Sequence, residues 1–108
     1  MPKFGSREGD LYIDGRKVIK GYQSVTGWYW FAVEDAGIQD TVVNDQLIEN
    51  DQIYYGLVQG EEEEWGNFSE GRLKGLEQQG WVRELSKDEL PSAGRRSYRM
   101  DPLFGTKD

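Results

Sequence analysis

The sequence predicts an α+β domain: an antiparallel sheet of about five or six strands with one main helix. Up to Phe68 the apolar residues alternate with a period of two, which is typical of strands. From Ser69 onward the chain has the capping residues of a helix. Its 108 residues suit one domain over 1–108, with flexible ends expected near 1–8 and 101–108.

The N-terminal part predicts a β-hairpin. Two short β-prone runs, residues 11–13 and 16–20, flank the pair Asp14-Gly15. Asp-Gly favours a type I′ turn, because both central positions of that turn need a positive φ. We therefore expect strands centred on Tyr12 and Val18.

Residues 26–34 predict a central strand with two apolar faces. Trp28 and Trp30 fall on one face, and Tyr29 and Phe31 on the other, so the strand should be covered on both sides. A Trp-x-Trp pair can also stack sugars or bases, but in a chain with few aliphatic residues such rings usually form the core. The following segment, 35–51, is polar, and we expect it to be irregular apart from a short strand at 41–43.

Two further strands are predicted around Tyr55 and Trp65, over residues 53–59 and 64–68, with a turn at 59–61 between them. Tyr54 and Tyr55 cannot both point inward on one strand, because successive side chains lie on opposite faces. One of them should line a surface, and we take Tyr54 as a candidate for contact with a partner.

The main helix is predicted over residues 70–79. Ser69 is a favourable N-cap, Phe68 can pack on Leu73 as a hydrophobic staple, and Gly80 suits the left-handed C′ position. Trp81 should then fold back onto the helix. A short strand around residue 82 and one capped turn at 86–89, ended by a proline, complete the prediction.

The predicted core combines the aromatic and aliphatic residues of these elements. They are Trp30, Phe31, Tyr55, Leu57, Phe68, Leu73, Leu76 and Trp81. Replacing Trp30 by alanine should cost about 3–5 kcal/mol of stability if its ring is buried. The C-terminal basic residues could bind a phosphate or a carboxylate partner, or neutralise the chain's own acidic middle; they are Arg95, Arg96 and Arg99, with Tyr98 among them.

Charge is distributed unevenly. Between Gly21 and Gly71 the chain has eleven carboxylates and no lysine or arginine, and the net charge is −7. Such a segment repels phosphate backbones and attracts basic protein surfaces. We therefore expect a protein partner with a basic surface and no nucleic acid. The candidate acidic and aromatic surface comprises Tyr54, Glu61, Glu62, Glu63 and Glu64.

Residue types that are missing exclude several kinds of site. The chain has no cysteine and no histidine, which removes disulfides, thiolate nucleophiles and every Ser-His or Cys-His arrangement. It also lacks the glycine-rich nucleotide motifs, and its four glutamates at 61–64 lack the spacing of a calcium loop. We therefore expect no cofactor and no metal. We also expect no membrane span, because the longest apolar run is the six residues 28–33. A soluble cytoplasmic protein is the simplest expectation.

The middle of the chain resembles a family of uncharacterised domains often encoded on plasmids and phages. The pattern is Trp-x-Trp-aromatic, an acid, aromatic-Gly-Leu-Val-x-Gly, Glu-x-x-Gly-x-Phe-Ser and a leucine-containing helix. The matching residues are Trp28, Trp30, Phe31, Glu34, residues 55–60, residues 64–69 and Leu73. The resemblance covers about half of the chain and implies an α+β fold and a mobile-element origin. It implies no activity.

A second resemblance is to the end of winged-helix regulators, carried by residues 73–82 and the basic run 95–100. It implies DNA binding, although residues 10–68 predict strands where a winged helix has helices.

We expect a small, acidic, non-catalytic protein-binding module, with a DNA-mimicking inhibitor from a mobile element as its concrete form. The alternatives are a winged-helix DNA-binding regulator and a carboxylate-based hydrolase. The hydrolase would use members of a set of acids, since two carboxylates suffice to cleave a glycoside. That set is Glu34, Asp35, Glu61, Glu62, Glu63 and Glu64.

Overall fold

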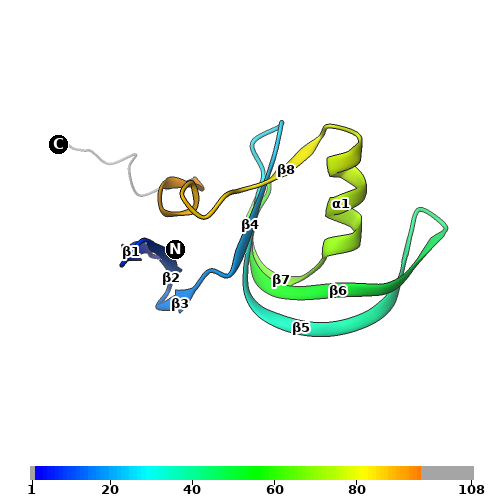
Figure 1. The fold of residues 1–108 in the computed structure, drawn as a ribbon, viewed down its shortest axis with the longest axis horizontal. Coiled ribbons are helices and arrows are strands. Elements are labelled where there is room, and N and C mark those ends of the chain that lie inside the picture. The colour runs from blue at the N-terminus through cyan, green and yellow to red at the C-terminus, as the bar shows by residue number, and fades with distance from the viewer. Residues whose placement is uncertain (1, 96–108) are drawn as a thin grey trace.

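A computed structural model describes residues 2–95 and confirms the α+β class, with one main helix and antiparallel strands (Figure 1). The strands are β1 (Phe4–Arg7), β2 (Asp10–Ile13), β3 (Arg16–Lys17), β4 (Lys20–Ser24), β5 (Tyr29–Val43), β6 (Gln46–Gln59), β7 (Glu63–Ser69) and β8 (Val82–Glu84). The helix is α1 (Glu70–Gln78), and a 3-10 turn, η1 (Leu90–Ser92), follows β8. The predicted flexible end at 101–108 lies outside the described residues, as do Arg96, Tyr98 and Arg99.

The strands form two sheets. A small sheet has the order β1-β2-β3, and the main sheet has the order β7-β6-β5-β4-β8. The type I′ turn is confirmed, because Asp14 and Gly15 have φ angles of 51° and 79°. Two details differ from the prediction: the second strand ends before Val18, and Lys20–Ser24 forms a strand that was not expected. Residues 4–7, inside the segment expected to be flexible, pair with β2 as β1.

The prediction of an irregular segment at 35–51 is wrong. These residues continue β5 and begin β6, and the turn between the strands is formed by Asn44 and Asp45, with φ angles of 50° and 64°. Three register shifts interrupt the pairing, between Ala32 and Glu34, between Asp35 and Ile38, and between Gln39 and Thr41. Bulges of this kind bend a strand pair, and they hid the alternation from sequence analysis.

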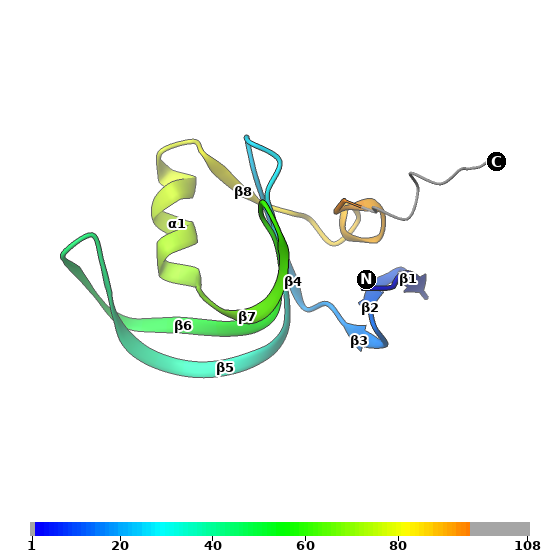
Figure 2. The same ribbon diagram turned by 180° about the vertical axis from the view of Figure 1, so that it is seen from behind.

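The distal part of this hairpin, residues 34–50, is called the arm here. It extends beyond the strands that flank it, because pairing with β4 ends at Ala32 and pairing with β7 begins at Ile53. In Figures 1 and 2 the curved hairpin passes below α1 and its tip rises beyond the helix. Within residues 2–95 the arm is therefore a two-stranded ribbon without a neighbouring strand on either side.

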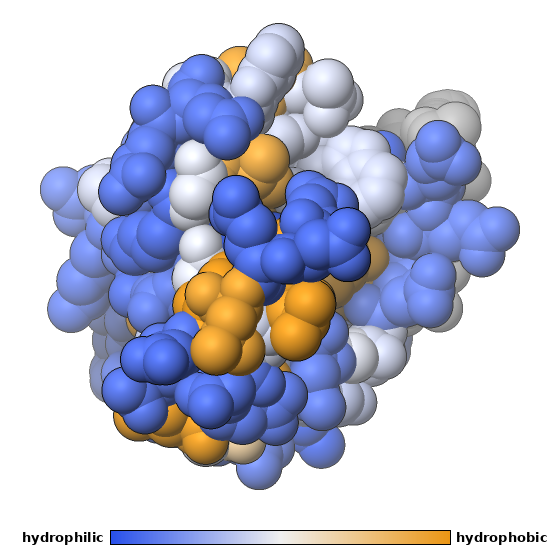
Figure 3. Space-filling view, turned by 90° about the vertical axis from the view of Figure 1, so that its right-hand side faces the viewer, coloured by the Kyte–Doolittle hydropathy of each residue, from blue (hydrophilic) through white to orange (hydrophobic). Residues whose placement is uncertain are grey.

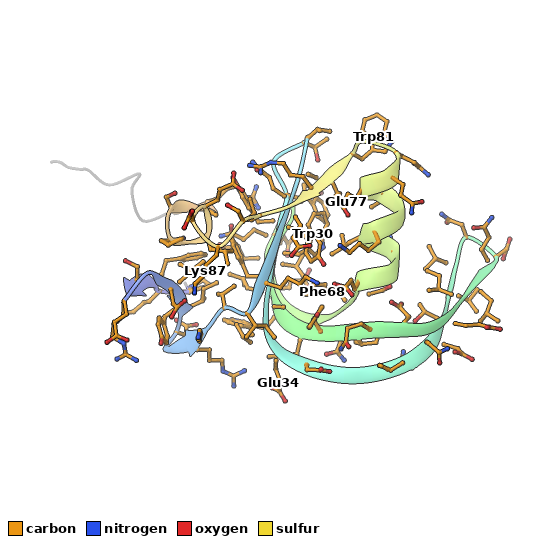
Figure 4. The ribbon with its side chains drawn as sticks, in the orientation of Figure 1. Trp30, Glu34, Phe68, Glu77, Trp81 and Lys87 are labelled. Carbon is orange, nitrogen blue, oxygen red and sulfur yellow. The ribbon has the colours of Figure 1, made fainter. Side chains whose placement is uncertain are left out.

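The predicted caps of α1 are confirmed. The Ser69 hydroxyl accepts a hydrogen bond from the Arg72 amide at 3.0 Å. At the other end Gly80 has a φ of 84°, and the amides of Gly80 and Trp81 donate to the carbonyls of Glu77 and Leu76, as in a Schellman motif. The Trp81 side chain, however, is 54% exposed and points away from the core (Figure 4), so its assignment to the core is wrong.

The core has two parts, one on each side of the main sheet. Phe31 and Leu57 are fully buried between that sheet, the small sheet and η1. On the other side Tyr22, Leu73 and Val82 are buried under α1, with Trp30, Phe68 and Leu76 packed against them. Trp30, Tyr55 and Phe68 are only partly buried. The rings of Trp30 and Phe68, on the helix side, are therefore available to line a surface hollow as well as to stabilise the fold.

Candidate functional site

Three of the four predicted glutamates line one surface hollow. Glu61 and Glu62 lie in the turn between β6 and β7, and Glu64 lies in β7; with Trp28 they line a hollow of about 610 Å³. Glu63 differs, because its carboxylate accepts a hydrogen bond from the Gln59 amide. The hollow therefore combines carboxylates with an indole ring, which suits a cationic group.

Trp28 owes its place in this hollow to Gly60. A Cβ atom at position 60 would lie 2.6 Å from the Trp28 ring, so only glycine lets the ring lie against the turn. The ring centroid is 5.9 Å from that of Trp30. By its position in the sequence Trp28 falls on an apolar strand face, and no local pattern indicates that it meets the glutamate turn.

Tyr54, the other predicted site residue, lies apart from that hollow. Its ring packs on Phe68, with centroids 6.1 Å apart, and the Lys20 ammonium is 5.9 Å from its centroid. Tyr54 therefore belongs to the packing between β6, β7 and β4. The structure does not bring it into one hollow with the glutamates.

The arm is the most exposed acidic element of the described chain. Its exposed carboxylates are Glu34, Asp35, Asp40, Asp45 and Glu49. Three large aliphatic side chains on it, Ile38, Val42 and Leu47, are more than half exposed. Figure 3 views the molecule from the side of the arm and shows apolar side chains surrounded by hydrophilic ones. Exposed aliphatic residues next to charges of one sign are typical of a protein-binding surface.

The arm is joined to the helix by a buried acid. Asp51, which is 2% exposed, accepts hydrogen bonds from the Gly71 amide at 2.7 Å and from the Ser69 hydroxyl. A Cβ at position 71 would lie 2.8 Å from the Asp51 carboxylate, so a glycine is needed there. The start of a helix favours a negative charge. Asp51 thus has a structural role and fixes the base of the arm.

A second network, partly buried, lies at the start of α1, and no sequence pattern indicates it. The Glu70 carboxylate accepts hydrogen bonds from the Lys20 ammonium and from the Tyr22 hydroxyl, the latter at 2.7 Å. Burial, and then the Glu70 bond, raise the pKa of Tyr22 far above its usual range. A phenol held neutral in this way is a hydrogen-bond donor and not a base, so this network links β4 to the helix.

This network makes folding stability depend on pH. Burial alone would raise the pKa of Glu70, but its bonds to Lys20 and Tyr22 outweigh burial and lower the pKa below its usual range. A carboxyl with a depressed pKa stabilises the fold above its unfolded pKa and loses that contribution as the pH falls through the folded value.

We therefore expect the free energy of unfolding to fall as the pH is lowered below about 4.5. Glu70→Gln should be less stable than the parent at neutral pH, and the difference should shrink in acid. Urea unfolding between neutral and acidic pH measures both. A Glu70→Gln protein whose deficit stays constant down to the acid limit would contradict this role of Glu70.

The acids of the hydrolase alternative do not form one group. Glu34 and Asp35 pair with Tyr55 and Tyr54, whereas the glutamate turn lies beyond Gln59, at the other end of that stretch of β6. Figure 4 shows Glu34 on the convex side of the sheet, away from α1. Hydrogen bonds from the Gly37 amide and Gln52 lower the pKa of Asp35, which is the wrong direction for a general acid.

The described residues contain no group of three or more acidic side chains that could hold a metal ion. Among the same residues no helix is both long and apolar enough to cross a membrane. Comparison of the chain with protein-family models, with curated proteins and with solved structures gave no match. The resemblance to plasmid and phage domains therefore stays a prediction.

Proposed function

We propose that this protein is a non-catalytic module that binds a protein with a basic surface, and that the arm is its main contact. The observation that carries the proposal is the arm itself: a projecting ribbon with five exposed carboxylates, exposed aliphatic side chains and no lysine or arginine. Charge of one sign speeds the encounter with an oppositely charged partner, and the aliphatic residues supply surface to bury.

A DNA-mimicking inhibitor is the concrete form that we favour. A target that binds nucleic acid has a basic groove, and a curved acidic ribbon can occupy such a groove in place of a phosphate backbone. An origin on a mobile element belongs to this proposal, as does a cytoplasmic location, since a chain without cysteine needs no oxidising compartment to fold.

The alternatives have less support. A winged-helix regulator needs two helices before its recognition helix, and the described residues before α1 form strands and turns. A hydrolase needs its carboxylates on both sides of one substrate, and the candidate acids are divided between the arm and the glutamate turn.

The proposal is tested by capture from a lysate of the native host, using the tagged parent and two variants of equal net charge. Asp45→Asn with Glu49→Gln removes two exposed charges from the arm tip. Glu8→Gln with Asp88→Asn removes two exposed charges elsewhere. We expect the parent and the second variant to retain the same basic protein at low salt, and the arm variant to retain less.

Raising the ionic strength to several times the physiological value should release that partner, because contacts between exposed charges are screened over about 8 Å at 0.15 M salt. Capture of a partner that is equally retained by the arm variant would contradict the arm as the contact. Recovery of no partner at either salt would count against protein binding altogether.

A further inference from the structure

Two adjoining surface hollows, together called the groove here, are lined in part by β7, an edge strand of the main sheet in the described chain. The acidic hollow at the glutamate turn adjoins a second hollow of about 470 Å³, which lies between α1 and the arm tip. The two hollows share Trp28, Val58 and Asn67 as lining residues. Consecutive β7 residues, 64–67 in one hollow and 67–69 in the other, line the groove, and consecutive residues share an edge and not a face of a sheet.

The outer edge of β7 carries backbone hydrogen-bonding groups. β7 is the last strand of its sheet among the described residues, so its outer side presents N–H and C=O groups without a neighbouring strand. A seven-residue strand is about 23 Å long at the usual rise of a strand. The groove therefore offers room for a peptide beside the outer backbone N–H and C=O groups of β7.

The groove has different chemistry at its two ends. At the glutamate turn it presents Glu61, Glu62 and Glu64 beside the Trp28 ring. Carboxylates and an indole face both attract a lysine or arginine side chain. Toward the helix the lining mixes the apolar side chains of Trp30, Phe68 and Leu76 with polar ones, among them Arg72. In Figure 4 Trp30 and Phe68 lie between the sheet and α1.

A buried hydroxyl in the second hollow needs a partner. Thr41 Oγ1 is inaccessible to solvent and makes no hydrogen bond with the described residues. Thr41 lines the second hollow, together with Arg72. Buried hydroxyl groups are normally hydrogen-bonded, because an unpaired one costs free energy. Because solvent does not reach this oxygen, the Thr41 side chain would have to rotate to present it to a peptide group in the groove.

We propose that the groove binds an extended peptide segment that adds to β7 as a further strand, with a lysine or arginine side chain at the glutamate turn and an apolar side chain against Phe68. This inference rests on the proposed function, because the segment is part of the basic partner. The arm then makes the charged encounter, and the groove holds one extended segment by backbone pairing and side-chain pockets.

A basic peptide fits this groove better than other occupants. A second copy of the chain would bring its own net charge of −7 against these glutamates, and a nucleic acid would bring phosphates. Peptide addition to a sheet edge also uses the backbone groups of β7, which a small cation would leave unpaired.

The experiment uses the whole chain and a blocked peptide of alternating lysine and valine, about six residues long, which matches the length of β7. The matched control peptide has glutamate in place of lysine. Amide shifts in a two-dimensional nitrogen-proton spectrum are followed during titration. We expect the basic peptide to shift the amides of β7 and the indole N–H signal of Trp28, and the acidic peptide to leave them in place.

Two variants separate the parts of the proposal. Glu62→Gln with Glu64→Gln should weaken binding of the basic peptide about 2- to 30-fold, the range for two exposed charge pairs. Glu8→Gln with Asp88→Asn has the same net charge and should bind as the parent does. Trp28→Ala should no longer bind the peptide. The amide signals of this variant should keep the dispersion of a folded protein, because the Trp28 ring lies at the surface.

Shifts confined to the arm, shifts equal for both peptides, or no shifts at all would overturn the groove proposal. The arm variant, Asp45→Asn with Glu49→Gln, should bind the peptide about as well as the parent. If the peptide does not bind while capture from the lysate still depends on the arm, the groove proposal is wrong and the proposed function is supported. If the peptide binds in the groove while capture is independent of the arm, the arm contact falls instead.

Discussion

Replacing Gly56 by alanine is expected to abolish the native fold. Gly56 pairs with Ala32 where β5 and β6 bend, and a Cβ there would lie 1.7 Å from the Phe31 carbonyl oxygen. That oxygen belongs to the backbone of a central strand and cannot move aside. The free energy of unfolding should fall by more than about 4 kcal/mol, which is most of the stability of a small domain. Circular dichroism and amide dispersion at room temperature measure it.

Gly66 provides the matched control, because it is the Cα partner of Gly56 on β7 and an added Cβ there meets no atom of the described residues within 4 Å. Gly66→Ala should change stability by no more than about 1 kcal/mol, since it removes backbone freedom without a clash. A Gly56→Ala protein that melts within a few degrees of the Gly66→Ala protein would show that the β5–β6 pair bends in another way.

Replacing Phe31 by alanine should have the second largest effect. Its side chain is fully buried and joins β5 to the small sheet: it stacks on Tyr29 of the same strand with centroids 5.7 Å apart, and it meets Phe4 of β1 edge-on at 5.7 Å. Removing a buried phenylalanine costs about 3–5 kcal/mol. Urea unfolding, monitored by circular dichroism, gives the difference in the free energy of unfolding between Phe31→Ala and the parent.

The control for Phe31 is Trp81→Ala, which removes a larger aromatic ring that is mostly exposed and should therefore cost far less. Trp30→Ala should fall between the two, because Trp30 is partly buried against Tyr22 and Leu73. If Trp81→Ala were as destabilising as Phe31→Ala, the division between core and surface described above would be wrong.

Local signals in the sequence were sufficient for much of the fold. The Asp14-Gly15 turn and both ends of α1 depend on backbone requirements of a few neighbouring residues, and those requirements are visible in the sequence. The capped turn after β8 is a further case: the amides of Ser86 and Glu89 bond reciprocally to each other's side chains, at 2.8 and 3.3 Å.

Features that depend on distant contacts could not be predicted. Bulges in β5 broke the period-two pattern, so a long hairpin resembled a loop. Glu70 meets Lys20 across fifty positions, and nothing local indicates that pairing. Likewise the four glutamates were recognised as acidic, but only the fold shows that Glu63 is bound internally by Gln59 while its neighbours face a tryptophan.

The most direct test of the account is the dissociation constant of the captured partner for three forms of the protein at two ionic strengths. The forms are the parent, the arm variant (Asp45→Asn with Glu49→Gln) and the control of equal net charge (Glu8→Gln with Asp88→Asn). At low salt the arm variant should bind about 2- to 30-fold more weakly than the parent, and the control should match the parent. The difference should diminish at high salt. Equal weakening of both variants, or of neither, would contradict the arm as the site of binding.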